Sequence, residues 1–199
     1  MIIYLIRHGE SISDVKNLYG GTFDDHLTEK GKQEAESLAE ELKNKNIQAI
    51  FSSPYFRAKE TAEILKNALG CNIELVEDIR ERNSYGFLSG KNKEWAKKEY
   101  PETCSKLKGY HFTIDGGEEY EGFKKRIGGA WNEIINSGYE RIVVITHGGP
   151  IRCLFREIFK FGEFKGDLGD CMIAEIEKNN AGFKLLNLTG AKLEKTKNV

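Results

Sequence analysis

Short runs of apolar residues alternate along the chain with longer segments in which apolar residues recur every three or four positions. Runs of the first kind predict buried strands, and segments of the second kind predict amphipathic helices. The predicted strands span residues 1–6, 49–51, 73–76, 141–146, 171–176 and 183–188. Residues 142–145 read Ile-Val-Val-Ile without a polar residue, which indicates a central strand with both faces covered.

Helices are predicted between these strands. They span residues 28–45, 53–69 and 118–136, and a fourth helix begins at residues 148–150. Thr28 is expected to cap the first helix, because its hydroxyl can accept a hydrogen bond from a free backbone N–H of the first turn. Ser53 is expected to cap the second helix, with Pro54 as its first residue.

The alternation of strands and helices predicts an α/β fold, a three-layer sandwich with a mainly parallel central sheet. In such folds the binding site lies outside the carboxyl ends of the strands. Residues 83–117 have an irregular pattern that contains several glycines, which predicts a small lid insertion of short helices and loops. No repeat or long linker divides the sequence, so we expect residues 1–199 to form a single domain.

The composition is that of an ordinary globular protein, with 39% hydrophobic residues, 31% charged residues and a net charge of −1. Because the chain is almost neutral, we expect neither nucleic acid nor a membrane as a partner, and any phosphate site must be a local concentration of positive charge. The apolar start is too short for a secretory signal. The four cysteines show no close pairing and no metal-ligand spacing, so we expect a reduced, cytoplasmic protein without a metal site.

Two histidines directly follow predicted strands, where an α/β fold places its site. His8 follows the first strand in the segment LIRHGES, and His147 follows strand 141–146 in the segment VVITHGGP. Each is followed by glycine, which lets a ligand approach the backbone closely. The helix that begins at Pro150 can also meet an anion with its free N–H groups. One such histidine is more often a hydrogen-bonded core residue, but two of them, with Arg7 adjacent, favour a functional site.

Two other strand ends supply charged candidates. Arg57 falls in the first turn of a predicted helix, where a cation opposes the helix dipole. An anionic ligand explains this placement better than helix stability does, and a solvated surface arginine is the alternative. Glu81 belongs to the charged segment DIRERN, and such a run usually forms a solvated surface. In a pocket with two arginines and two histidines, Glu81 becomes a candidate proton donor.

These segments resemble the motifs of the histidine phosphatase superfamily, the group that contains the cofactor-dependent phosphoglycerate mutases and their phosphatase relatives. The resemblance covers nearly the whole chain in the expected order, in LIRHGES, NLYGGTFDDHLTEKG, IFSSPYFRAKETA, IRERNSYGFLSG, DGGEEYEGFKKR and VVITHGGPIR. It implies a phosphoglycerate mutase-like fold and an enzyme that transfers a phosphoryl group through a phosphorylated histidine, with no cofactor and no metal.

The resemblance also implies a role for each candidate. His8 would attack phosphorus and form a phosphohistidine. Arg7, Arg57 and His147 would surround the phosphoryl oxygens and stabilise the charge of the transition state, which positioning and electrostatics can achieve without a metal. Glu81 would protonate the leaving oxygen and then activate water. The expected substrate-binding residues are Arg7, Ser11, Asp14, Asn17, Gly20, Gly21, Arg57, Glu81, Arg82, Gly148 and Gly149.

Four positions depart from the family pattern, of which one, Glu119, stands where Ser is usual. Asp14 stands where Asn commonly contacts phosphate, and a carboxylate there would repel the phosphate. Either Asp14 points away or it binds a cationic or hydroxyl part of the substrate, and Asn17 is a candidate for the missing amide role. Gly20 and Gly149 stand where mutases place Thr and Asn, so two groups that hold a phosphoglycerate are missing.

The departures favour a phosphatase that hydrolyses a small phosphorylated metabolite. A phosphoglycerate mutase is the alternative, and a non-catalytic phosphate-binding scaffold is the third hypothesis. Loss of His8 or Glu81 would mark a scaffold, and both residues are present. The sequence does not choose among α-ribazole phosphate, sugar phosphates and phosphoglycerates as substrates, and it is compatible with a monomer or a homodimer.

Overall fold

A sheet of six strands lies at the centre of the protein, in the order β3-β2-β4-β1-β5-β6. The computed structural model describes residues 1–107 and 109–194. The strands are β1 (Ile2–Arg7), β2 (Ala49–Ser52), β3 (Asn72–Leu75), β4 (Arg141–Thr146), β5 (Ile173–Asn179) and β6 (Gly182–Thr189). The first four strands in chain order are parallel, and β5 and β6 join the sheet antiparallel. The predicted α/β class with a mainly parallel sheet is confirmed.

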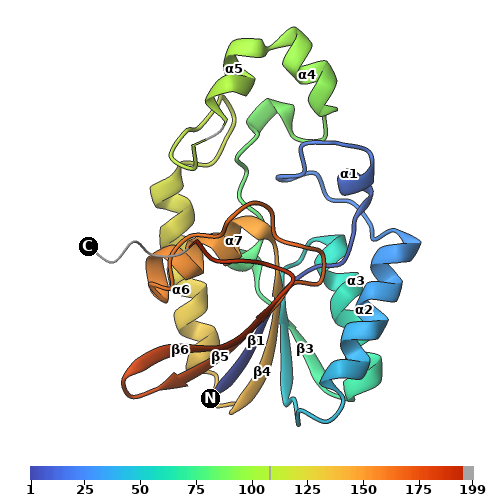
Figure 1. Cartoon of the computed structure of the whole chain (residues 1–199), viewed down its shortest axis with the longest axis vertical. Helices are drawn as coiled ribbons and strands as arrows, with labels where there is room; N and C mark the ends of the chain where they lie inside the picture. Colours follow the sequence, from blue (N-terminus) through green and yellow to red (C-terminus); the bar gives the residue numbers. More distant parts are fainter. Residues whose placement is uncertain (108, 195–199) are drawn as a thin grey trace.

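Helices cover both faces of this sheet and complete the three layers (Figure 1). One face carries α2 (Glu29–Leu42) and α3 (Phe56–Leu69). The other face carries α6 (Tyr120–Ile135) and α7 (Gly148–Cys153), and the chain continues from α7 into a π-helical turn, Leu154–Ile158. No helix in the described ranges is both long enough and apolar enough to cross a membrane.

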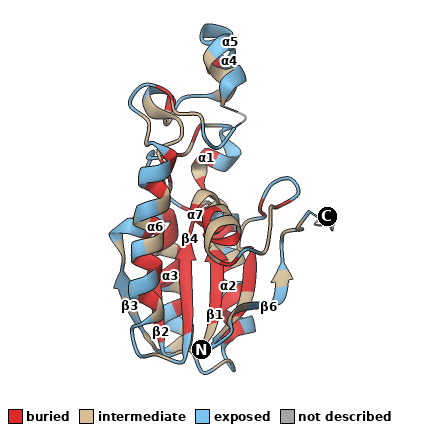
Figure 2. Cartoon of the chain, turned by 90° about the vertical axis from the view of Figure 1, so that its left-hand side faces the viewer, coloured by how far each residue is buried: buried red, intermediate tan, exposed pale blue. Residues whose placement is uncertain are grey.

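Successive residues of a strand point to opposite faces of the sheet, so one strand contributes side chains to two hydrophobic cores. In β1, Ile3 and Leu5 pack with the residues of α6 and α7, whereas Tyr4 and Ile6 pack with those of α2 and α3. Every residue of β1 between its two ends is buried, as Figure 2 shows for the middle of the sheet. This double burial is the physical reason that β1 and β4 read as unbroken apolar runs.

The described part of the insertion, residues 83–107 and 109–117, lies beyond the carboxyl ends of the parallel strands, at the opposite end of the molecule from the N-terminus (Figure 1). It consists of loops and short helices, as predicted. The helices between β3 and α6 are η1 (Glu77–Ile79), η2 (Gly86–Leu88), α4 (Lys93–Glu99) and α5 (Pro101–Lys106). The insertion has a small apolar core of its own that includes Leu88, Ala96 and Ile114, and Tyr19, which follows α1 (Ile12–Val15), packs into this core.

The prediction for the start of α3 was wrong. The helix begins at Phe56 with Tyr55 as its N-cap, two residues later than a Ser53 cap requires. Ser53 does not cap because its hydroxyl faces His147, with Oγ 2.7 Å from Nε2 of the ring. Oγ of Ser53 also accepts a hydrogen bond of 3.4 Å from the N–H of Tyr55, the N-cap residue, so the contact with His147 accompanies a local turn that precedes the helix.

Other element boundaries differ by a few residues. Thr28 caps α2 as predicted, since its side chain accepts a hydrogen bond from the N–H of Gly31 at 3.0 Å, but the helix ends at Leu42 rather than near residue 45. Strand β5 begins at Ile173 instead of residue 171, because Cys171 has a φ of +49°, which is incompatible with a strand.

Candidate active site

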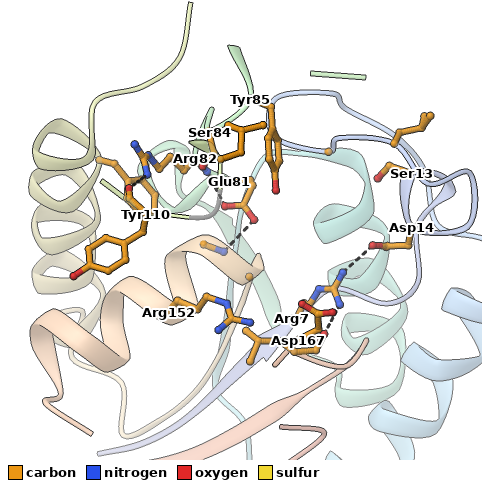
Figure 3. Close-up of a pocket in the computed structure, with 18 of the residues that line it drawn as sticks. Arg7, Ser13, Asp14, Glu81, Arg82, Ser84, Tyr85, Tyr110, Arg152 and Asp167 are labelled. Atoms are coloured by element: carbon orange, nitrogen blue, oxygen red, sulfur yellow. Dashed lines mark hydrogen bonds and ion pairs between the residues drawn. The ribbon is translucent and has the colours of Figure 1, made fainter. Parts of the chain in front are cut away.

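A cavity of about 540 Å³ opens at the carboxyl ends of the parallel strands, and its size suits a small molecule. The predicted site residues that line it are Arg7, His8, Ser11, Asp14, Gly20, Gly21, Arg57, Glu81, Arg82, Gly148 and Gly149. They come from the end of β1 and the loop after it, from α3, from the segment after η1 and from α7 (Figure 3). The fold therefore brings together residues that are far apart in the sequence.

His8 follows β1 and is almost completely buried, with 4% of its surface exposed. Its Nδ1 lies 2.8 Å from the carbonyl oxygen of Gly9. A carbonyl only accepts hydrogen bonds, so Nδ1 carries the ring proton and Nε2 keeps its lone pair. Nε2 accepts a hydrogen bond of 3.2 Å from Nε of Arg57. A ring in this form can act as a nucleophile through Nε2.

The surroundings of His8 keep the ring neutral. Burial lowers the pKa of His8 well below its ordinary value of 6.5, and the cations of Arg57 and Arg7 lower it further. The Gly9 carbonyl and the Asp14 carboxylate act in the opposite direction, with smaller effects. The imidazole is consequently unprotonated at neutral pH without the help of a separate base.

Arg57 lies in the first turn of α3, as predicted, and 3% of its surface is exposed. Its Nη1 pairs with Oδ1 of Asp25 at 3.0 Å and donates to the carbonyl of Phe23 at 2.9 Å. A buried cation needs such partners, above all at a helix N-terminus, where the dipole repels it. With Nη1 held in this way, Nε of Arg57 is directed at His8.

His147 is fully buried next to His8, and the centroids of the two rings are 5.1 Å apart. Its Nε2 faces Oγ of Ser53, and its Nδ1 has no hydrogen-bond partner among the described residues. Burial lowers the pKa of His147 well below 6.5, and the Arg57 cation adds to this effect. The second histidine is therefore also neutral, and one of its nitrogens is unused by the protein.

Arg7, the last residue of β1, is bound by oxygens of the protein itself. Its Nη2 pairs with Oδ1 of Asp14 at 2.9 Å. Its Nη1 lies 2.8 Å from Oδ1 of Asp170 and donates to the carbonyl of Leu168 at 2.6 Å. Asp14 thus does not point away from the site: it lines the cavity and faces Arg7 (Figure 3).

The Glu81 carboxylate accepts two backbone hydrogen bonds, one at each oxygen. The N–H of Gly149 donates to Oε2 at 3.1 Å, and the N–H of Arg82 donates to Oε1 at 2.7 Å. A Cβ atom at position 149 would lie only 2.2 Å from Oε1 of Glu81. Glycine at this position leaves the space that the carboxylate occupies, which gives a structural reason for one of the departures from the family pattern.

Two of the expected substrate-binding residues are placed less directly. Arg82 lines the cavity, but its guanidinium donates to the carbonyls of Glu118 and Tyr110 and so joins the insertion to the start of α6. Asn17 is not among the residues that line the cavity, and its carbonyl accepts a hydrogen bond from the N–H of Lys93. Neither side chain supplies a free donor toward His8 in this structure.

Several charged residues of the site were missed in the sequence. Arg152 points into the cavity from α7 (Figure 3), with its Nη2 donating to the carbonyl of Gly166 at 2.6 Å. Arg152 follows Gly148 by four residues, so the two residues lie on the same face of the helix. This spacing is a signal in the sequence by which Arg152 could have been predicted. Asp167 and Asp170 come from a glycine-rich loop with no periodic pattern, so no local signal pointed to them.

Residues 3–189 match the family model described as "Histidine phosphatase superfamily (branch 1)". The chain is a histidine phosphatase superfamily member. The resemblance seen in its segments is thereby confirmed. The fold agrees: the structure of Bacillus stearothermophilus YhfR superimposes with a TM-score of 0.86 at 26% identity, over 97% of this chain and 98% of that one.

Curated relatives of this superfamily member carry names of two enzyme classes. Phosphoserine phosphatase 1 of Hydrogenobacter thermophilus is 28% identical over 196 residues, which cover 94% of this chain and 92% of the relative. A 2,3-bisphosphoglycerate-dependent phosphoglycerate mutase of Parvibaculum lavamentivorans is 31% identical and covers 81% of each chain. The superfamily member is thus an enzyme of a family that contains phosphatases and mutases.

Proposed function

We propose that this enzyme is a metal-independent phosphatase that hydrolyses small phosphomonoesters through a phosphohistidine on His8. The observation that carries the proposal is the state of His8: a buried, neutral ring that lines the cavity and whose Nε2 lone pair accepts a hydrogen bond from the Arg57 guanidinium. A nucleophile of this kind, beside fixed cations, meets the two requirements of phosphoryl transfer, which are positioning and charge stabilisation.

In the first step, Nε2 of His8 bonds to phosphorus while the bond from phosphorus to the ester oxygen breaks. Protonated Glu81 gives its proton to the departing oxygen, which leaves as an alcohol. The hydrogen bond from Nδ1 to the Gly9 carbonyl stabilises the positive charge that the ring acquires. For this attack the Nε–H of Arg57 must turn from Nε2 of His8 to a phosphoryl oxygen as the substrate binds, because Nε2 has only one lone pair and in the free enzyme that lone pair accepts the Arg57 hydrogen bond.

In the second step, ionised Glu81 removes a proton from a water molecule, whose oxygen attacks phosphorus. The bond from phosphorus to Nε2 breaks, inorganic phosphate leaves, and His8 and Glu81 return to their initial states. No oxidant, reductant or metal ion is needed for this balance. Arg7 and Arg57 line the cavity in which the phosphoryl group would sit, whereas His147 is buried behind His8 and is not among the lining residues.

Two features of the cavity support water, rather than the hydroxyl of a sugar acid, as the acceptor. Gly20 leaves an open space, since among the described residues, apart from its chain neighbours, only the hydroxyl of Ser13 lies within 4 Å of the position of a Cβ atom there. Gly149 leaves room for Glu81, so the amide that mutases place at this position has no counterpart. The relative named as a mutase supports the alternative, a phosphoglycerate mutase. The experiments described below distinguish the two.

The proposal predicts release of inorganic phosphate from p-nitrophenyl phosphate at a rate that EDTA does not change. His8→Ala should reduce kcat/KM by at least about a thousandfold, because the nucleophile is lost. An acid quench of the wild type should trap phosphate in an acid-labile, base-stable bond on His8. His26→Ala, at an exposed histidine, is the matched control and should retain turnover.

Three outcomes would contradict the proposal. Turnover by His8→Ala at the wild-type rate would exclude the phosphohistidine. Conversion of 3-phosphoglycerate to 2-phosphoglycerate that is faster than phosphate release and needs a bisphosphoglycerate primer would indicate a mutase. A wild type that binds phosphate but turns over none of a set of phosphorylated metabolites would indicate a scaffold.

A further inference from the structure

The carboxylate of Asp14 is paired with Arg7, the arginine that we expect to bind a phosphoryl group. Its Oδ1 lies 2.9 Å from Nη2 of Arg7, at the edge of the cavity that also holds His8. A carboxylate and a phosphate are the two anions that a guanidinium binds best, and both do so through oxygens in the same directions. Asp14 is therefore placed where a phosphoryl oxygen would otherwise be bound.

The position of Asp14 is fixed by its own contacts. Its Oδ2 accepts hydrogen bonds from the backbone N–H of Ser11 at 2.9 Å and from the Ser11 hydroxyl at 2.7 Å. The bond from the Ser11 N–H is one half of the capping box of α1, so the carboxylate belongs to the local structure and is not a freely rotating surface group. The contact between Oδ1 and Arg7 follows from this arrangement.

The opposite side of Arg7 is also occupied. Asp170 and the carbonyl of Leu168 both face Nη1, at 2.8 and 2.6 Å. One guanidinium with a single positive charge is thus shared by two carboxylates before any substrate arrives. A phosphate dianion that approaches Nη2 of Arg7 either displaces the Asp14 carboxylate or binds more weakly because that carboxylate repels it, since like charges at hydrogen-bond distances repel strongly.

We propose that Asp14 is an internal competitor for phosphate at Arg7, which weakens the binding of inorganic phosphate and so limits inhibition of the enzyme by its own product. This inference rests on the proposed function only in placing the phosphoryl group between His8 and Arg7. It gives a role to the residue that departs from the family pattern. The carboxylate tunes anion affinity, and it takes no part in bond formation.

The properties of asparagine at the same position support this assignment. An amide oxygen could still accept from the Ser11 N–H and keep the cap of α1. Its NH₂ group would then face the cavity, where it repels Arg7 slightly and can donate to a phosphate oxygen. Asp14→Asn therefore removes the competing charge and adds a donor while it preserves the size and the capping role of the side chain.

The test is direct titration of the resting enzyme with inorganic phosphate by calorimetry at pH 8, where phosphate is a dianion. We expect Asp14→Asn to lower the Kd for phosphate at least about tenfold. The matched control is Asp167→Asn, which removes the same charge from the same cavity at a residue that forms no ion pair with Arg7 in the described structure. This control should change the Kd less than threefold.

An unchanged Kd in a folded Asp14→Asn variant would overturn the inference, and so would an equal change in both variants, because that result would reflect only the total charge of the cavity. Thermal unfolding of each variant shows whether it is folded. If phosphate binds neither the wild type nor Asp14→Asn, and neither protein turns over any ester, the proposed function has failed instead. The two failures are thus distinguishable.

Discussion

Arg57 is a buried cation at a point where a helix disfavours positive charge. It lies in the first turn of α3, and the partners that compensate it are Asp25 and the carbonyl of Phe23. This arrangement holds the guanidinium rigidly, because each of its hydrogen bonds is made to the backbone or to a side chain that is itself buried. A cation held in advance against His8 can stabilise developing charge without reorganisation during the reaction.

Glu81→Gln tests whether Glu81 is the proton donor. The variant keeps the size of the side chain but has no carboxylic proton, so esters with poor leaving groups should suffer most. We expect kcat/KM for an alkyl phosphate to fall by about 10² to 10⁴ and that for p-nitrophenyl phosphate to fall far less, because nitrophenolate leaves without a proton. The ratio kcat/KM is the appropriate measure, since it reports the step that expels the leaving group.

The control for this experiment is Glu77→Gln, an exposed carboxylate on η1 that pairs with Arg80. It should leave the kinetics of both esters at the wild-type values. An equal loss for the two esters in Glu81→Gln would show that Glu81 does not protonate the leaving oxygen.

At the scale of elements, the start of α2 is packed directly against the loop that carries His8. A Cβ atom at Gly31 would lie 2.1 Å from the carbonyl oxygen of Glu10, and one at Gly9 would lie 2.5 Å from the carbonyl oxygen of Gly31. The two backbones approach each other so closely that neither glycine leaves room for a side chain. The loop after β1 is therefore held by α2 as well as by its own hydrogen bonds.

A pair of glycine substitutions measures this contact. Gly31→Ala should lower the free energy of unfolding by roughly 1–3 kcal/mol, because the methyl group overlaps with backbone atoms that cannot move aside. Gly129→Ala is the matched control: its position in α6 is exposed and has nothing within 4 Å of the added Cβ. It should raise the stability by about 0.5–1 kcal/mol through helix propensity alone.

Urea denaturation of both variants provides the measurement. Turnover should also fall in Gly31→Ala, because the displaced loop carries His8 and Ser11, and it should stay unchanged in Gly129→Ala. A neutral or stabilising effect of Gly31→Ala would show that the loop and α2 can separate without cost.

The elements predicted correctly, and the places at which the chain presents the candidate histidines and Arg57, have local causes. The strands are apolar runs, Thr28 caps by bonding within its own turn, and His8, His147 and Arg57 stand at fixed distances from strand ends. The wrong start of α3 and the unforeseen contacts of Arg82 have non-local causes. The hydroxyl of Ser53 faces His147, and the guanidinium of Arg82 donates to the carbonyls of Glu118 and Tyr110. A sequence pattern contains no information on such partners.

At the scale of the whole molecule, the site is assembled from parts that depend on one another. Glu81 lies in the segment that follows β3 and η1, but its carboxylate is held by a hydrogen bond from the N–H of Gly149 on α7. Arg126 of α6 donates to the carbonyls of Asp78, Arg80 and Glu81 and so ties the segment that carries Glu81 to the helical layer. The geometry of the cavity is therefore a property of the entire fold. The buried, neutral rings of His8 and His147 also couple this region to the stability of the whole protein.

This link predicts that the protein loses stability in weak acid. In the folded state, burial and the Arg57 cation lower the pKa values of His8 and His147 well below 6.5, whereas an unfolded chain has histidine pKa values of about 6.5. Below pH 6.5 the unfolded chain therefore binds protons that the folded protein does not. As a result, the free energy of unfolding decreases as the pH decreases. The slope approaches about 1.4 kcal/mol per pH unit for each histidine.

The window from pH 6.5 to 5 lies above the range in which the carboxyl groups with lowered pKa values, such as Asp14 and Glu118, titrate. Burial raises the pKa of the Asp170 carboxyl, and any proton that this group takes up in the window opposes the loss of stability. Urea denaturation at intervals across the window should show the loss in the wild type. His8→Gln should remove about half of the slope, since one of the two buried rings no longer titrates. The same substitution at the exposed His111 is the matched control and should keep the wild-type slope. If His8→Gln retains the full slope, the neutral state of His8 is not what couples the site to the stability of the fold.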